Sequence, residues 1–229
     1  MPGPVGIIAS SASASETQMR QSGNGNYLTT ADKPGVETPD DFTIDWYGAI
    51  DVIGASNQTM INKFSTGTPN RCWMLRVGTA TVDTFMSSDG TNQPSPVTAP
   101  TSSIPAVTNI GVRFTRRKSD GVARLYTSLV DPPSWTQVGT ATNNVGFTLF
   151  DSNAPIVIGG HTGGTVGSPA MYFRRASIYN GFEGAGTEVA SPNVTGLALG
   201  LTSFVDTQGN TWTLMGTAAL VTRPKMRVQ

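Results

Sequence analysis

Carboxylates are the residues from which a sugar-cleaving enzyme would take its acid and its base. Hydrolysis with retention needs two carboxyl groups about 5 Å apart across the scissile bond. The strongest predicted strand covers residues 42–51 and contains Asp45. The position two residues later, where a partner carboxylate is needed, is Tyr47, and Asp51 on the same face is too far from Asp45 along the strand. The chain has four glutamates, and none supplies the pair: Glu16, Glu37, Glu183 and Glu188. We therefore expect a protein that is not an enzyme.

The single cysteine and the single histidine offer another route to catalysis. Cys72 and His161 could form a nucleophile–base pair, but Cys72 alternates with Trp73 within a predicted strand, which is typical of a buried structural cysteine. The sequence holds no Gly-x-Ser-x-Gly motif and no phosphate-binding loop. The glycine-rich segment 159–164 could present backbone N–H groups to an anion, although a plain connection between strands is the simpler interpretation. One cysteine also excludes an intrachain disulfide and a thiolate metal cage.

Arginine side chains are candidates for binding. Arg113, Arg116, Arg117 and Lys118 lie together at one end of a predicted hairpin, and Arg174 lies on the last long strand. Arginine binds carboxylates bidentately and stacks on aromatic rings, which suits an interface with acidic neighbours or an anionic surface polymer. Charge placed at strand edges for solubility is the alternative.

Aromatic side chains could form a sugar platform. Such a platform needs an exposed ring with amide or carboxylate hydrogen bonds beside it. Trp73 or Trp135 would serve, with Asn143 or Asn144 close to Trp135 in the chain, whereas packing in the core is the alternative for each ring. The candidate ligand or interface residues are therefore Tyr47, Trp73, Arg113, Arg117, Trp135, His161 and Arg174.

Short strands must position these side chains, because glycine and proline interrupt nearly every helix-length window. The 229 residues include 26 Gly and 15 Pro, and helices need about 8–20 uninterrupted residues whereas strands need about 4–8. Alternation over 42–51 places Phe42, Ile44 and Trp46 on one face, as in a half-buried antiparallel strand. The sequence predicts strands over 42–51, 59–64, 72–78, 81–87, 109–117, 122–129, 138–142, 155–159, 170–180, 200–206, 211–215 and 218–221, with a surface loop over 88–105. This spacing favours an all-β, two-sheet antiparallel jelly-roll sandwich.

Both ends of the chain lack the strand pattern. Residues 1–26 are predicted as an irregular N-terminal arm for assembly, in which 15–21 could form a short helix. Residues 27–220 are predicted as the sandwich, and 221–229 as a C-terminal tail whose proline disfavours a central strand. We expect neither end to be needed for the sandwich, so deletion of residues 1–22 should leave the domain folded.

Charge and apolar content limit the partners and the location. Charged residues are 13% of the chain and the formal net charge is zero, which argues against nucleic acid as a partner. No apolar stretch is long enough to span a membrane, and the N-terminus lacks a signal-peptide pattern. The composition, rich in Thr, Ser, Gly and Asn, is nevertheless typical of an exported β domain. A virion protein is synthesised in the host cytoplasm and used outside it, which would explain both the missing signal-peptide pattern and the composition of an exported domain.

Several stretches carry a resemblance to a known family. The chain resembles the concanavalin A-like, laminin-G-type jelly roll, in the version found in bacteriophage virion proteins. The stretches that carry it are 38–46, the hairpin 109–117 with 121–126, the pair 155–160 and 171–181, and the C-terminal 205–218. Together they cover about residues 27–220.

The resemblance implies a non-enzymatic virion structural protein, at a tail tip, fibre or capsid surface, that docks on other virion proteins through its termini. It implies a homo-oligomer that presents its sandwich outward, with a host surface glycan as a further partner. The alternative is a lectin-like module that recognises cell-wall glycan. Glycanases of this fold carry Glu-x-Asp-x-x-Glu on one strand, a motif that this chain lacks.

Domains of this type also often hold Ca²⁺ at the rim. The chain has no Asp-x-Asp-x-Asp array, and aspartates in turns commonly bond their own backbone. Calcium therefore stays an alternative without assigned ligands, and no other cofactor is expected. The turn-like aspartates are Asp40, Asp41, Asp89, Asp151 and Asp206.

Overall fold

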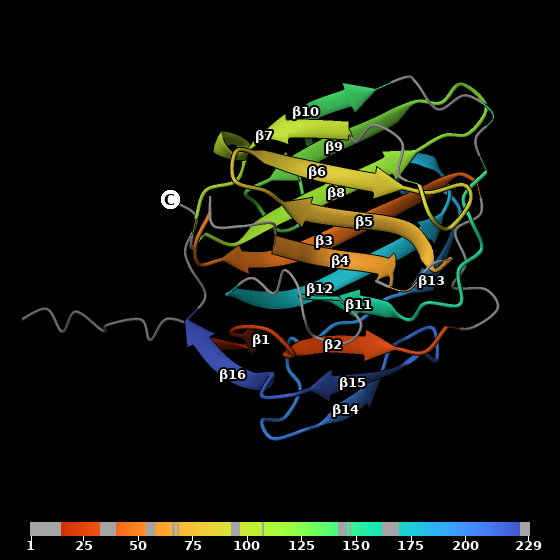
Figure 1. Cartoon of the computed structure of the whole chain (residues 1–229). Helices are drawn as coiled ribbons and strands as arrows, with labels where there is room; N and C mark the ends of the chain where they lie inside the picture. The colour runs from red at the N-terminus through yellow and green to blue at the C-terminus, as the bar shows by residue number, and fades with distance from the viewer. Residues whose placement is uncertain are drawn as a thin grey trace, which may run out of the picture.

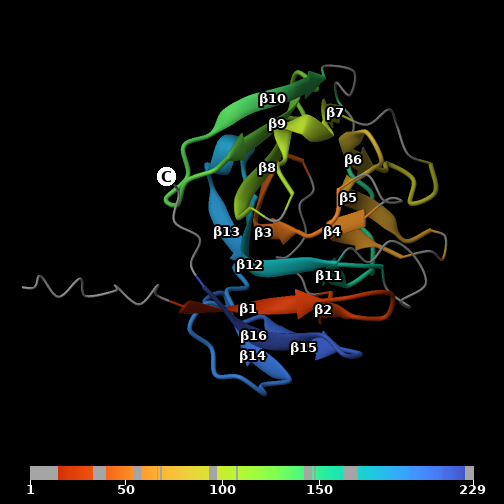
Figure 2. The ribbon, with the colours of Figure 1, turned by 90° about the vertical axis from the view of Figure 1, so that its left-hand side faces the viewer.

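The protein folds into two packed antiparallel β-sheets. The computed structural model describes residues 15–32, 40–53, 58–65, 67, 69–92, 97–106, 108–141, 146, 148–161 and 170–224. Figure 1 shows the strands of both sheets, and Figure 2 shows the sandwich from the side, with β8 and β9 in one layer and β5 and β6 in the other. This architecture confirms the all-β jelly-roll prediction.

Each sheet contains eight strands within the described part of the chain. Sheet A runs β10 (Thr136–Ala141), β9 (Ala123–Ser128), β8 (Ile110–Arg116), β3 (Phe42–Ile50), β12 (Met171–Asn180), β1 (Ser15–Gln21) and β16 (Ala219–Pro224), with β13 (Thr187–Ala190) also paired to β12. Sheet B runs β14 (Ser203–Val205), β15 (Thr211–Met215), β2 (Tyr27–Thr30), β11 (Ile156–Ile158), β4 (Gln58–Phe64), β5 (Arg71–Val77), β6 (Thr81–Met86) and β7 (Val97–Pro100).

Helix is almost absent from the residues that the structure describes. Two 3₁₀ turns occur among the described residues, η1 (Thr101–Ser103) and η2 (Phe182–Gly184). No helix in this part of the chain has the length and apolarity to cross a membrane. The result follows from the spacing of glycine and proline, which leaves room for strands only.

The core lies between the sheets, where the alternating faces of the strands meet. Phe42, Ile44 and Trp46 of β3 point inward and are fully buried, as their period-2 spacing predicts. Phe114 of β8 packs edge-on against Phe42, with ring centroids 5.3 Å apart. Burial of such side chains drives the two sheets together.

One side of the sandwich is closed by contact between the sheet edges β7 and β10. A β-bulge lies between Gln137 and Gly139 of β10. A Cβ atom at Gly139 would lie 2.6 Å from the carbonyl oxygen of Thr98 on β7, so this close approach requires glycine.

The two ends of the described chain differ from the sequence prediction. Residues 15–21 form neither an arm nor a helix but strand β1, which pairs with β12 on one side and β16 on the other. The prediction of an irregular arm as far as residue 26 and of a tail from residue 221 is therefore wrong for the described residues, and residues 1–14 and 225–229 lie outside them. The strand was missed because Glu16, Gln18 and Gln21 are buried polar residues, which gives β1 no apolar alternation.

Three further strands differ from the prediction. β7 lies within the predicted surface loop 88–105, and the sequence predicts no strand over the residues of β2 or of β13. All three have four residues, which are too few to show a clear alternation of apolar and polar side chains. These strands form because they pair with neighbouring strands.

Candidate functional site

The outer face of sheet A carries the side chains with binding chemistry. Alternation along β3 turns Asp45 and Tyr47 outward, and both are nevertheless buried. Arg113 stands opposite Asp45 on β8, and its Nε and Nη2 each donate to a carboxylate oxygen of Asp45 at 2.7 Å. This bidentate pair has the geometry in which arginine binds carboxylate most strongly.

Aromatic rings and guanidinium groups stack across the same face. Trp135 lies 5.9 Å from the Tyr47 ring, and the Arg113 guanidinium lies 4.6 Å from the centre of the Trp135 ring. Arg175 covers the Tyr47 ring at 4.1 Å. Gly111 makes room for both rings, because a Cβ there would lie 2.9 Å from Tyr47 and 3.1 Å from Trp135. Tyr47 is thus a wall of the site and not an open platform.

The loop between β9 and β10 is tied to β12 by Asp131. Its two oxygens accept bonds from Arg175 at 2.9 and 2.7 Å, and Nη2 of Arg174 lies 3.3 Å from one of them. The hydrogen bond from Arg175 lowers the pKa of Asp131 below its usual value. The carboxylate therefore stays ionised at neutral pH and holds the loop against the sheet.

A bulge in β12 allows both arginines to face outward. Neighbouring residues of a regular strand point to opposite faces, but the register shifts between Phe173 and Arg175. Phe173 and Ala176 point inward and are buried, so Arg174 and Arg175 share the outer face. Bulges redirect side chains in this way.

Glu16 of β1 pairs with Arg174. Arg174 Nε lies 2.8 Å from Oε1 of Glu16, and its Nη2 donates to Oε2 at 2.9 Å. Gln18 donates to Oε1 of Glu16 at 2.6 Å. The Glu16 and Arg174 side chains are 5% and 13% exposed, so this is a buried pair formed across two strands.

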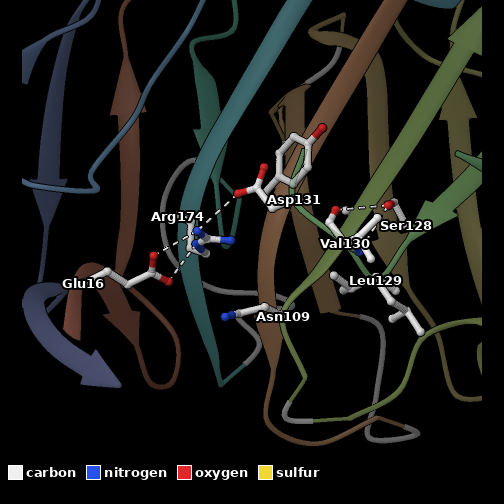
Figure 3. A pocket seen from close by; sticks show the side chains of 10 residues that line it. Glu16, Asn109, Ser128, Leu129, Val130, Asp131 and Arg174 are labelled. Atoms are coloured by element: carbon white, nitrogen blue, oxygen red, sulfur yellow. Dashed lines mark hydrogen bonds and ion pairs between the residues drawn. The ribbon is translucent and has the colours of Figure 1, made fainter. Parts of the chain in front are cut away.

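A cavity of about 210 Å³ opens between these groups. Figure 3 shows Glu16, Arg174 and Asp131 on one side and the backbone turn at Leu129 and Val130 on the other. Below, we call this cavity the Arg174 pocket. Its lining residues are Glu16, Tyr47, Asn109, Ile110, Gly111, Ser128, Leu129, Val130, Asp131 and Arg174.

Two polar groups in the Arg174 pocket have spare hydrogen-bonding capacity among the described residues. The Nη1 atom of Arg174 points away from Glu16 toward the open space (Figure 3), while Nε and Nη2 face the carboxylates. The amide nitrogen of Asn109 points toward Arg174 (Figure 3), and its buried Oδ1 has no partner. Leu129 and Val130 add apolar surface, being 50% and 41% exposed.

The arrangement suits binding better than acid–base catalysis. A glycosidase must keep one of its two carboxyl groups protonated. Glu16 and Asp131 both flank the pocket, but each faces Arg174, and the pKa of Asp131 is lowered. Burial raises the pKa of Tyr47 to about 12, so it is neutral. The described lining of the pocket therefore offers donors and acceptors that are held in place, which suits binding.

The structure brings together four of the seven predicted site residues. Tyr47, Arg113, Trp135 and Arg174 lie on the outer face of sheet A. Arg117 lies at the hairpin end instead, bonded to Asp120. Arg116, from the same predicted cluster, points inward, is fully buried and donates to the carbonyl of Asp40 at 2.6 Å.

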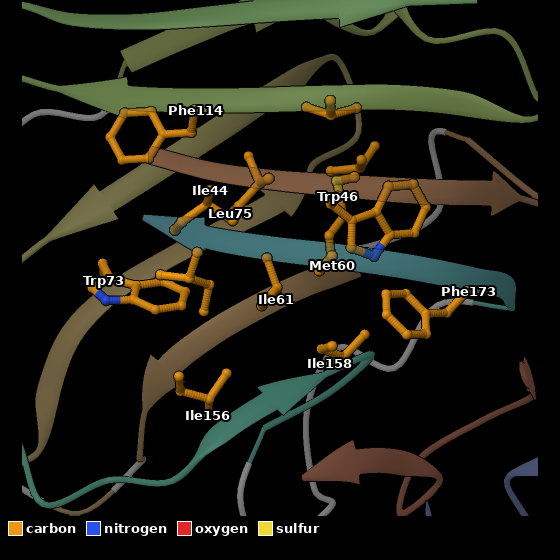
Figure 4. Packing of buried hydrophobic residues seen from close by; sticks show 14 of the residues in the cluster. Ile44, Trp46, Met60, Ile61, Trp73, Leu75, Phe114, Ile156, Ile158 and Phe173 are labelled. Atoms are coloured by element: carbon orange, nitrogen blue, oxygen red, sulfur yellow. The ribbon is translucent and has the colours of Figure 1, made fainter. Parts of the chain in front are cut away.

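Trp73 is a core residue, so its assignment as a sugar platform is wrong. The side chain is 1% exposed and stacks on Phe42 with ring centroids 6.3 Å apart. Figure 4 shows Trp73 pointing into the core with Ile61 and Leu75. Asn143 and Asn144, the amides considered as partners of the sugar platform, lie outside the described residues.

His161, which follows β11, and Cys72 of β5 are both buried. His161 Nε2 lies 2.9 Å from Thr59 Oγ1, its ring packs edge-on against Phe64, and burial lowers its pKa. Cys72 belongs to the core, and burial raises the pKa of its thiol to about 12. A thiol in that state is not a nucleophile, so the geometry gives no support to a catalytic pair.

The turn aspartates bond to groups of the protein itself. Asp89 accepts from the backbone N–H groups of Thr91 and Asn92, and Asp206 accepts from Trp212 Nε1 at 2.9 Å. Asp40 pairs with a lysine, Asp41 accepts from a backbone N–H, and Asp151 lies at the surface. Among the described residues no three His, Cys, Asp or Glu side chains are grouped as metal ligands.

Several site residues carry no signal in the sequence. Glu16, Asn109 and Asp131 come from β1, the start of β8 and the β9–β10 loop. Arg174 and Glu16 are 158 residues apart in the chain. The adjacent pair of arginines in a strand was the one available hint, because two neighbouring charges in a half-buried strand require a bulge or an edge.

Comparison of the structure with solved structures identifies the fold. A putative carbohydrate binding protein from Bacteroides ovatus superposes with a TM-score of 0.60 at 14% identity, over 91% of this chain and 60% of that one. The CBM40 of the Ruminococcus gnavus IT-sialidase, bound to α2,3 sialyllactose, superposes with a TM-score of 0.58 at 14% identity, over 75% of this chain and 94% of that one. The same CBM40 without ligand gives a TM-score of 0.58 at 13% identity.

The fold is one that carbohydrate-binding proteins use. At these identities the likeness establishes the fold alone, and the chain spans 60% of the length of the first of these proteins. No family model matches the chain, and no curated protein matches its sequence.

Proposed function

We propose that the protein is a carbohydrate-binding module and that the Arg174 pocket holds one sugar residue. The observation that carries the proposal is the pairing, in one pocket, of spare polar groups on Arg174 and Asn109 with the exposed apolar turn at Leu129 and Val130. A sugar ring presents hydroxyl groups along its edge and C–H groups on its faces, so it needs both kinds of surface. The fold shared with carbohydrate-binding proteins supports the same function.

The polar groups of the pocket are held in place before any ligand arrives. Asp131 is fixed by Arg175, and Glu16 and Arg174 hold one another. Binding then requires little ordering of side chains, which is one of the main costs of association. The Nη1 atom of Arg174 and the amide of Asn109 would bond to neighbouring hydroxyl groups, and a hydroxyl can donate as well as accept.

The size of the pocket limits what it can hold. Its volume of about 210 Å³ is below the roughly 300–1,000 Å³ of sites that enclose drug-sized ligands. One sugar residue would enter, and the remainder of a glycan would lie outside, along Leu129. We therefore expect recognition of a chain end or a branch.

A blocking substitution tests this assignment. Isolated protein is screened on a glycan array, and the affinity for the best ligand is measured by calorimetry. Leu129→Arg should abolish binding because the long side chain fills the pocket mouth, while Val52→Arg, at a residue 53% exposed outside the pocket lining, should bind as the wild type does. Asn109→Ala should weaken binding about two- to tenfold, the value of one hydrogen bond.

Two results would reject the proposal. One is a folded wild-type protein that binds no glycan on the array. The other is a Leu129→Arg variant with unchanged affinity, which would place the site elsewhere. Absence of enzymatic activity and use in a bacteriophage virion both stay predictions, and co-purification of the protein with intact particles is the measurement for the second.

A further inference from the structure

The C-terminal end of sheet B presents an uncharged apolar surface. Between Glu188 and Arg223 the chain has one charged residue, Asp206, and this residue is buried and accepts hydrogen bonds from Ser191, Gln208 and Trp212. The same segment carries exposed apolar side chains at Leu199, Leu201 and Val205, the last of them 64% exposed.

The strand register places Leu201 and Val205 on one face. Ser203 stands opposite Thr213 and Val205 opposite Thr211 in the β14–β15 pair, and extension of this register brings Leu201 opposite Met215. Residues that stand opposite one another share a face of the sheet. The outer face of the hairpin therefore consists of apolar and hydroxyl side chains only: Leu201, Ser203 and Val205 with Thr211, Thr213 and Met215.

The same hairpin leaves a free main-chain edge. β14 is the outermost strand of sheet B, at the lower end of the molecule in Figure 1, and no described strand pairs with its far side. Leu214 N donates to the carbonyl of Thr202 at 2.8 Å, and Asp206 N donates to the carbonyl of Asn210 at 2.9 Å. In an antiparallel pair, hydrogen-bonded positions alternate, so the N–H and C=O groups of Ser203 and Val205 face outward.

The other edges of the described strands carry features that disfavour pairing. β16 contains Arg223 and Pro224, β7 ends in Pro100, β10 has a bulge and lies against β7, and β13, which pairs with β12, carries Glu188. Short strands, charge, proline, bulges and cover are the devices by which proteins block edge-to-edge association. β14 has only three residues, but the bond to Thr202 extends its pairing, and among the described residues the strand has no charge, proline or bulge and no strand covers its far side.

We propose that this edge and its outer face form the interface between two copies of the chain. An uncharged surface can meet its own copy about a twofold axis without repulsion, and interface cores are depleted in charge. With the axis at Phe204, Ser203 of one copy faces Val205 of the other, and their N–H and C=O groups form two reciprocal pairs of hydrogen bonds. The two copies of sheet B then become one continuous sheet, and the apolar faces of the two hairpins lie side by side.

The oligomeric state of the full chain tests the proposal. Light scattering after size exclusion, over a range of concentrations, should give a dimer for the wild type. Val205→Lys should weaken dimerisation by about tenfold or more, because two like charges would meet across the axis. Val52→Lys is the matched control, at a similarly exposed valine outside the patch, and it should stay dimeric. Circular dichroism should show that both variants are folded.

Cross-linking tests the register. Ser203→Cys/Val205→Cys, oxidised with glutathione disulfide, should give a covalent dimer, because the Cα atoms of such a pair lie about 5.5 Å apart, within the range that a disulfide spans. Cys72 is buried and should not compete. A monomeric wild type at every concentration, or a Val205→Lys variant that dimerises as tightly as the wild type, would overturn the proposal. So would a monomer that dimerises only when residues 1–14 are deleted, since that result would assign the edge to the chain's own N-terminal segment.

Discussion

Deletion of residues 1–22 should unfold the protein, whereas deletion of residues 1–14 should not. The longer deletion removes β1, which lies between β12 and β16 in sheet A. The shorter one keeps every described contact of that strand. The sequence by itself predicts that both truncations fold, so the experiment separates the tertiary structure from the sequence pattern.

The magnitude follows from three losses. Met19 is fully buried, and loss of such a side chain costs about 2–5 kcal/mol. Removal of Glu16 leaves Arg174 buried without its closest partner, which costs about 3 kcal/mol, the low end of the usual range because Asp131 remains 3.3 Å away. β16 also loses the strand with which it pairs, and with it the burial of Leu220.

Together the first two terms are about 5–8 kcal/mol, comparable to the whole stability of a domain, about 5–15 kcal/mol. If any folded protein survives, its melting temperature should fall by about 10–30 °C, because each kcal/mol shifts the midpoint of a chain this long by about 2–4 °C. The assay is thermal melting followed by circular dichroism. A 1–22 deletion that melts within a few degrees of the wild type would refute the assignment of β1 to the sheet.

A point substitution checks the same strand without removing it. Met19→Ala should destabilise the protein by about 2–5 kcal/mol, while Arg20→Ala, at the exposed position beside it, should change stability by less than about 0.5 kcal/mol. Urea unfolding measures both. Equal effects of the two substitutions would contradict the burial pattern of β1.

Three more outcomes are expected. Gly48→Ala should prevent folding, because the new Cβ would lie 2.2 Å from the carbonyl oxygen of Tyr172; soluble expression with a native circular dichroism spectrum would contradict this. Cys72 should react with a thiol reagent only after denaturant is added, since burial raises its pKa to about 12; rapid labelling of the native protein would show the core to be open. Burial lowers the pKa of His161, so the unfolded chain, with a pKa near about 6.5, takes up the proton first. The contribution of His161 to the free energy of unfolding is therefore fully present above about pH 6.5 and is lost as the pH falls below that value. The melting temperature should decrease between about pH 7.5 and 5.5 more in the wild type than in His161→Gln.

The sequence determined the fold class because the relevant signals are local. Alternation over 42–50 and 110–116 specifies strands with one apolar face, and glycine and proline exclude helices of useful length. The Asp-Gly turn before Val122 likewise specifies the hairpin of β8 and β9. These preferences act within a few residues, so they can be derived without knowledge of the neighbours.

Only the tertiary structure decided which polar residues form the site. β1 is a strand because it pairs with β12 and β16, and its Glu16 is buried against Arg174, 158 residues away. A buried polar side chain gives its own segment no apolar periodicity. The bulge that turns Arg174 and Arg175 to the same face depends on pairing with β3. The Arg174 pocket likewise exists because the β9–β10 loop reaches β12 through Asp131. Each of these features depends on which distant segments pair with one another. The free energy of that pairing depends on the packing of the whole chain and not on the local sequence.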